Sequence, residues 1–183
     1  MLSATEEIRT SRLVLRAPRE DDGFPDVQMI GDTGERGGPG KDGSRLKRWK
    51  SFLTGVGHWQ MRGLGFLAIT DHADGTIYGR CGLLPHDDTD ETQLAYNLYD
   101  GFEGRGIAFE AAVAVRHHAG ERLNLPPLVS FVSPGNDRSH QLAERLGATR
   151  LGYREIAGET LVFYRHVTWN APLAQAQWHE VTL

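Results

Sequence analysis

A glycine loop that opens directly into an alanine-rich stretch constrains this chain more than any other feature. The loop is "DGFEGRG" at 100–106, and the segment 107–124 that follows it has five alanines and continuous apolar coverage, which predicts a helix. Residues 92–100, "TQLAYNLYD", are predicted to form the strand that leads into the loop. A strand, a tight glycine loop and the free N–H groups of a helix N-terminus can together bind a phosphate or pyrophosphate.

The spacing of the glycines distinguishes this loop from two common kinds of phosphate-binding loop. A dinucleotide-binding loop reads G-x-G-x-x-G and follows the first strand of its fold. Here the order is Gly101-x-x-Gly104-x-Gly106, after the fourth predicted strand. The loop lacks the Gly-Lys-Ser/Thr of a P-loop, which excludes that class of nucleotide site.

The rest of the pattern predicts one mixed sheet with helices on its faces, an α/β (mixed α+β) class. Strands are expected at 11–18, 65–71, 76–84, 92–100, 127–134, 150–156 and 160–167, and helices at 20–32, 44–62, 107–124 and 136–148. Asp74-Gly75 predicts a tight hairpin between two of these strands. Without repeats or a linker, residues 1–183 are expected to form a single domain, with a core at 10–167 and a tail at 168–183.

Composition excludes several classes of partner. The formal net charge is −4 and the basic cluster "SRLKRWK" at 44–50 fits the solvated face of a helix, so no nucleic-acid partner is expected. The chain lacks an apolar run near the ~20 residues that a membrane span needs, and its N-terminus does not resemble a signal peptide. The single cysteine, Cys81, excludes an intrachain disulfide. A cytoplasmic protein without a membrane partner is the expectation.

Six motifs in order resemble the GNAT superfamily of acyl-coenzyme A dependent N-acyltransferases, and in particular its ribosomal-protein N-terminal acetyltransferase (Rim-type) branch. They are "RLVLRAP" at 12–18, "GFLAI" at 65–69, "GRCGL" at 79–83, "AYNL" at 95–98, "GRGIAFEA" at 104–111 and "NDRSHQLAERLGA" at 136–148. The resemblance implies a mostly antiparallel sheet of about seven strands, flanked by about four helices and splayed between its fourth and fifth strands. It also implies direct transfer of an acetyl group from acetyl-CoA to a primary amine.

The same resemblance assigns roles to particular residues. Backbone N–H groups would cradle the pyrophosphate of acetyl-CoA at Gly104, Arg105, Gly106, Ile107 and Ala108. The backbone N–H near Leu98 would polarise the thioester oxygen, as an oxyanion-hole donor does. Asn136 would bind the pantetheine arm or a water, and Ser139 would donate a proton to the leaving sulfur. Both residues also fit a simple helix cap. Gly101 stands where the family often has Gln or Arg.

The sequence leaves the general base open. Gln93 occupies a place where relatives often carry Glu, and an amide cannot accept the proton. The remaining candidates, each of which also fits an ordinary surface side chain, are His58, His86, Asp87 and Glu91. Without a strong base, an α-amino group with a pKa near 8 is a better acceptor than a lysine amine near 10.4.

The sequence also supports an alternative function and several structural predictions. A GNAT-fold module that binds acyl-CoA without turnover is the alternative to an enzyme. No metal is expected, because the adjacent His117 and His118 face different directions on a helix. Cys81 is expected to pack in a core strand, and Trp49 and Trp59 in the core. The loop 31–43 fits either a lid over the acceptor or disorder, and Trp178 could pack in a homodimer interface.

Overall fold

The computed structural model describes residues 7–22, 45–86, 90–156 and 158–171. The predicted loop at 31–43, Asp87 and Trp178 lie outside these residues, as does the predicted helix at 20–32 beyond a 3-10 turn at Glu20–Asp22. The strands are β1 (Ile8–Arg9), β2 (Leu13–Arg16), β3 (Phe66–Asp71), β4 (Ile77–Pro85), β5 (Thr92–Leu98), β6 (Val129–Val132), β7 (Thr149–Ile156) and β8 (Glu159–Arg165). The α-helices are α1 (Arg45–Arg62), α2 (Ile107–Glu121) and α3 (Asp137–Arg145).

The described strands form one sheet in the order β1-β2-β3-β4-β5-β6-β8-β7. Every neighbouring pair is antiparallel except β5 and β6, which confirms the expected mixed, mostly antiparallel fold. The sheet has one strand more than the motifs predicted. That strand is β1, whose two residues pair with Val14 and Leu15 of β2 and are too short to give a sequence pattern of their own.

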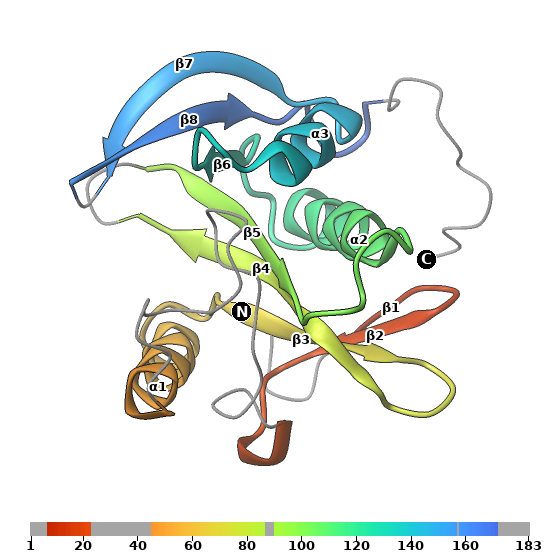
Figure 1. Cartoon of the computed structure of the whole chain (residues 1–183). Helices are drawn as coiled ribbons and strands as arrows, with labels where there is room; N and C mark the ends of the chain where they lie inside the picture. The colour runs from red at the N-terminus through yellow and green to blue at the C-terminus, as the bar shows by residue number, and fades with distance from the viewer. Residues whose placement is uncertain (1–6, 23–44, 87–89, 157, 172–183) are drawn as a thin grey trace.

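Helices cover both faces of the sheet, as Figure 1 shows. α2 packs against β1, β2, β4 and β5, and its small side chains Ala111, Ala112 and Ala114 are fully buried there. α1 lies on the opposite face, where Phe52 meets Ala68 of β3 and Tyr99 just after β5. Cys81 is fully buried in β4, as predicted, and burial raises the pKa of its thiol. Trp49 and Trp59 are half-buried and pack against core residues. No described helix combines the length and apolar character needed to span a membrane.

The sheet divides where β5 and β6 diverge, which confirms the splay expected between the fourth and fifth predicted strands. The register joins β5 and β6 at a single pair of residues, Gln93 and Val129. Next to this pair, the Ser130 hydroxyl donates a 2.8 Å hydrogen bond to the Leu94 carbonyl. The two strands are therefore held together at one end only, and a gap opens along the rest of β5.

A buried histidine supports this junction. The ring of His166 follows β8, is 2% exposed, and has its Nε2 atom 2.9 Å from the Ser130 hydroxyl. Since that hydroxyl gives its one hydrogen to Leu94, His166 Nε2–H is the donor of this hydrogen bond. Burial, followed by the charge of Arg116, lowers the pKa of His166 from 6.5 to about 4.

We predict that His166 makes the fold sensitive to acid. The unfolded chain binds the histidine proton near pH 6.5 and the folded protein only near pH 4, so this contribution is complete at neutral pH and is lost as the pH falls through that window. Between pH 7 and 4.5 the loss should be about 2 kcal/mol. Urea unfolding at both pH values measures it. His166→Gln keeps an N–H near the Nε2 position but does not titrate, so its pH dependence should be flatter. An equal dependence in both proteins would contradict the prediction.

Candidate functional site

A cleft of about 500 Å³ lies where β5 parts from β6, bounded by the glycine loop, α2 and α3. Its lining residues come from the end of β5, from the adjoining glycine loop with the start of α2, and from α3 about 30 residues further along the chain. They are Tyr96, Asn97, Leu98, Glu103, Gly104, Gly106, Ile107, Ala108, Phe109, Asn136, Arg138, Ser139, Gln141, Leu142 and Arg145. A second cavity, of about 200 Å³, shares Tyr96, Asn97, Asn136 and Ser139 with the first. The two cavities therefore meet at β5 and the start of α3.

The glycine loop has a backbone that favours glycine at three positions. Gly101, Gly104 and Gly106 have φ angles of +90°, +74° and +76°. Gly106 is the N-cap of α2 and makes no side-chain capping bond. The first helical backbone bond of the turn runs from Glu110 N–H to the Gly106 carbonyl, so the N–H groups of Ile107, Ala108 and Phe109 precede the helical ladder. With the positive end of the helix dipole, these groups suit an anion.

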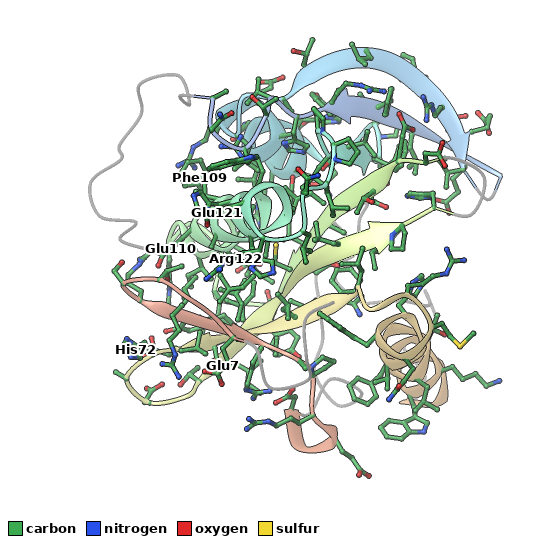
Figure 2. All side chains as sticks on the ribbon, turned by 180° about the vertical axis from the view of Figure 1, so that it is seen from behind. Glu7, His72, Phe109, Glu110, Glu121 and Arg122 are labelled. Atoms are coloured by element: carbon green, nitrogen blue, oxygen red, sulfur yellow. The ribbon has the colours of Figure 1, made fainter. Side chains whose placement is uncertain are left out.

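An arginine in the turn between β1 and β2 connects the glycine loop to α2. The Arg12 guanidinium donates to Glu110 Oε2 of α2 at 2.6 Å and to the Arg105 carbonyl at 3.2 Å. Glu110 is 4% exposed and also accepts from the Thr10 hydroxyl. Figure 2 shows Glu110 where α2 crosses the first two strands. This contact, the Arg12–Glu110 clasp, ties the glycine loop to the sheet.

The backbone N–H of Leu98 points toward the cleft. The next residue, Tyr99, donates its N–H to the carbonyl of Tyr78 in β4, on the opposite side of the chain from the cleft, at 2.8 Å. Backbone groups of successive strand residues point to opposite edges, so the Leu98 N–H points away from β4. That edge of β5 is the one that lines the cleft.

Asn136 and Ser139 are held together at the start of α3. The Asn136 side-chain oxygen accepts from the Ser139 backbone N–H at 3.1 Å, the cap predicted from sequence. The Tyr96 hydroxyl donates to the Ser139 carbonyl at 3.3 Å and so connects β5 with α3. The helix cap uses the backbone N–H of Ser139, so the Ser139 hydroxyl takes no part in this cap.

Arginines give the outer part of the cleft a positive charge. Arg138 and Arg145 line it from α3, and Arg145 lies 4.6 Å from the ring centroid of Phe109. Glu103 lines it from the glycine loop and is 3.6 Å from Arg138. Neither arginine was among the site residues predicted from the sequence. Their seven-residue spacing places them on one helix face with Leu142, and that periodicity could have identified them.

The structure brings most of the predicted site residues into this one cleft: Leu98, Gly104, Gly106, Ile107, Ala108, Asn136 and Ser139. Arg105 is not among the lining residues, because its carbonyl is turned to Arg12 and its guanidinium lies 5.5 Å from the ring centroid of Phe102.

The candidate bases are distributed differently. Glu91 accepts hydrogen bonds from Arg154 and from Arg165, the latter at 2.6 Å. His86 contacts Gln93, with 3.1 Å between Nε2 and Oε1. His58 lies on α1 and lines neither cavity. None of these three described residues therefore stands in the cleft as a base.

Comparisons with known proteins agree with this geometry. The model of the acetyltransferase (GNAT) domain matches residues 12–149. An acetyltransferase from Agrobacterium tumefaciens is 34% identical, with 92% of this chain and 98% of that chain covered and a TM-score of 0.70. A putative ribosomal-protein-serine acetyltransferase from Vibrio cholerae is 20% identical, covers 91% of this chain and 99% of its own, and has a TM-score of 0.70.

A putative GNAT-family acetyltransferase from Bordetella pertussis is 22% identical, with 88% of this chain and 99% of that chain covered and a TM-score of 0.72. The two structures below 25% identity share the fold, and the family match extends over most of this chain. The fold with its splayed sheet and strand–glycine loop–helix unit is thus that of an acyltransferase. The chain belongs to the GNAT acetyltransferase family.

Proposed function

We propose that this protein transfers an acetyl group from acetyl-CoA to a primary amine. One observation carries the proposal: two cavities meet at the cleft-facing edge of β5 and share Tyr96, Asn97, Asn136 and Ser139. Two substrates entering from opposite sides would meet there. The larger cavity suits the donor, and the smaller one suits an acceptor, either a small amine or a peptide N-terminus.

The donor side has the groups that acetyl-CoA requires. The pyrophosphate would bind the N–H groups between Gly104 and Ala108, with Arg138 and Arg145 adding positive charge along the same cleft. The pantetheine arm would lie along β5, next to Leu142 and Asn136. The absence of Gln or Arg at Gly101 leaves this scheme intact, because Gly101 does not line the cleft.

The chemistry needs few protein groups. The amine nitrogen attacks the thioester carbonyl carbon, the new C–N bond forms and the C–S bond breaks. The Leu98 N–H would stabilise the charge on the carbonyl oxygen, and the Ser139 hydroxyl would relay a proton from solvent to the departing thiolate, so that the hydroxyl itself is restored. The proton lost by the amine passes to solvent. An amine of low pKa is favoured, because about a fifth of an α-amine with pKa 8 is neutral near pH 7.4.

Ser139→Ala tests this assignment without removing the helix cap, since the cap uses the Ser139 backbone N–H. We expect kcat to fall about 100-fold, the low end of a proton-transfer contribution, with the KM for acetyl-CoA and the melting temperature little changed. Free-thiol release from acetyl-CoA across a panel of amines, each at several concentrations, measures both parameters. An unchanged kcat would remove Ser139 from the mechanism.

The same assay decides between an enzyme and a binding module. Acetyl-CoA that binds tightly, shown by calorimetry, with no thiol released for any amine would indicate a non-catalytic acyl-CoA sensor. Thiol release that depends on the amine, with the acetylated amine identified by mass spectrometry, would establish the transferase.

A further inference from the structure

A tyrosine at the point where the two cavities meet connects the two elements that carry the proposed chemistry. Tyr96 of β5 is half-buried and lines both cavities, and its hydroxyl donates a 3.3 Å hydrogen bond to the carbonyl of Ser139 in the first turn of α3. It stands three residues, about 10 Å along the strand, beyond the pair that joins β5 to β6. The hydrogen bond therefore connects β5 with α3 where the sheet is already open.

On the strand side, Tyr96 is fixed relative to Leu98. The two residues are two positions apart in β5, so their backbone groups face the same edge of the strand and their side chains the same face of the sheet, about 7 Å apart. From Thr92 to Leu98, β5 pairs with β4 without a shift in register, and the Tyr96 ring packs against the hydrophobic core. The hydroxyl of Tyr96 is therefore attached to the same rigid strand as the proposed oxyanion donor.

On the helix side, α3 contacts tyrosines from both parts of the divided sheet. The carbonyl of Ser139 accepts from Tyr96 of β5, while the next residue, His140, has its Nδ1 atom 3.0 Å from the hydroxyl of Tyr164 in β8. These two strands lie on opposite sides of the gap, with β6 between them in the sheet order. Of the two tyrosine contacts, the one from Tyr96 joins Ser139 to the strand that carries the proposed oxyanion donor.

We propose that Tyr96 is a positioning residue, whose hydroxyl holds Ser139 at the distance from the Leu98 N–H at which one thioester contacts both groups. This inference rests on the proposed function, in which the Leu98 N–H binds the thioester oxygen and the Ser139 hydroxyl relays a proton to the sulfur. Oxygen and sulfur are bonded to the same carbon of a thioester, so the two protein groups must keep a fixed separation, and catalytic groups tolerate errors of only about 0.5 Å. Tyr96 acts through Ser139 and takes no part in the proton transfer itself.

Tyr96→Phe tests the inference in the full-length protein, because it removes the hydroxyl and retains the ring that packs against the core. We expect kcat to fall about 5-fold, the effect of losing one neutral hydrogen bond, while the KM for acetyl-CoA changes less than 2-fold. The matched control Tyr164→Phe removes the hydroxyl that contacts the neighbouring His140, and should change kcat less than 2-fold. Amine-dependent thiol release gives the kinetic constants, and melting temperatures show that both variants fold.

A double-mutant cycle separates positioning of Ser139 from any other role of the tyrosine. In a Ser139→Ala background, Tyr96→Phe should lower kcat less than 2-fold, because no hydroxyl remains at residue 139 to be positioned. A 5-fold loss in both backgrounds would show that Tyr96 acts independently of the Ser139 hydroxyl and would overturn the inference. An unchanged kcat in Tyr96→Phe, an equal loss in Tyr164→Phe, or a higher KM for acetyl-CoA without a loss of kcat would overturn it as well.

The outcomes separate this inference from the proposed function. Amine-dependent thiol release by the wild-type protein supports the transferase whatever the effect of Tyr96→Phe. If the wild-type protein is active and Ser139→Ala keeps the full kcat, the inference is wrong, because Ser139 then has no hydroxyl function to be positioned, and the transferase proposal stands. If no amine supports thiol release by the wild-type protein, both the transferase and the positioning role of Tyr96 are overturned.

Discussion

Gly104→Asp is expected to raise the KM for acetyl-CoA about 100-fold. Gly104 lines the cleft at the glycine loop, where the backbone would receive a doubly charged pyrophosphate. No atom lies within 4 Å of a Cβ added there, so the loop has room for the new side chain. Asp also tolerates a positive φ better than most residues. The loss therefore comes from a carboxylate placed beside two phosphates, where like charges repel.

Two controls isolate the charge effect. Gly104→Asn has nearly the same size and backbone strain without the charge, and should raise the KM about 10-fold or less. Gly101→Asp adds the same charge at a similar φ of +90°, also with no atom within 4 Å of its Cβ, but outside the cleft lining. It should change the KM less than 3-fold. Equal effects of Gly104→Asp and Gly101→Asp would contradict the placement of the pyrophosphate.

Arg12→Ala should destabilise the protein by about 2 kcal/mol and raise the KM for acetyl-CoA several-fold. The change leaves the Glu110 carboxylate, with its side chain 5% exposed, without its cationic partner. Removing one partner of a buried pair costs 3–5 kcal/mol, and we reduce that figure because the Arg12 side chain is itself 52% exposed. The KM rises because Arg12 also holds the Arg105 carbonyl of the glycine loop.

A double-mutant cycle assigns the stability loss to the clasp. In a Glu110→Gln background the buried charge is absent, so adding Arg12→Ala should cost less than 1 kcal/mol. Arg9→Ala is the matched control, since Arg9 pairs with Glu7 at the surface, with a side chain 58% exposed, and should cost under about 0.5 kcal/mol. Urea unfolding of the variants measures each term. The clasp has no stabilising role if Arg12→Ala behaves like Arg9→Ala.

Much of the fold follows from local patterns. The predicted strand at 76–84 and the helix at 136–148 agree with β4 and α3 to within a few residues, because alternation and capping residues act over short distances. β1 could not be found in this way. It is a two-residue strand formed by pairing with β2, and its position depends on the Thr10 and Arg12 contacts with α2, about a hundred residues further along the chain.

The candidate site likewise has some features that the local sequence predicts and others that depend on tertiary contacts. Gly104 and Gly106 could be predicted, because a backbone with positive φ before a helix favours glycine, which is visible in the sequence. The direction of the Leu98 N–H depends on strand pairing, and the approach of Arg138 and Arg145 depends on where α3 packs. The role of Glu91 as the anchor of two arginines from β7 and β8 is likewise set by tertiary contacts, which no local pattern contains.

The single point of pairing between β5 and β6 has a consequence for association between molecules. A strand edge whose backbone groups face away from the ladder ordinarily invites another chain to add a strand, and exposed edges of this kind promote aggregation. Here the cleft-facing edge of β5 lies between α2 and α3, where Phe109 and Leu142 line the approach. The two helices on either side of this edge hinder a strand of another molecule from pairing along it. The same features that open the cleft thus also limit strand addition between molecules.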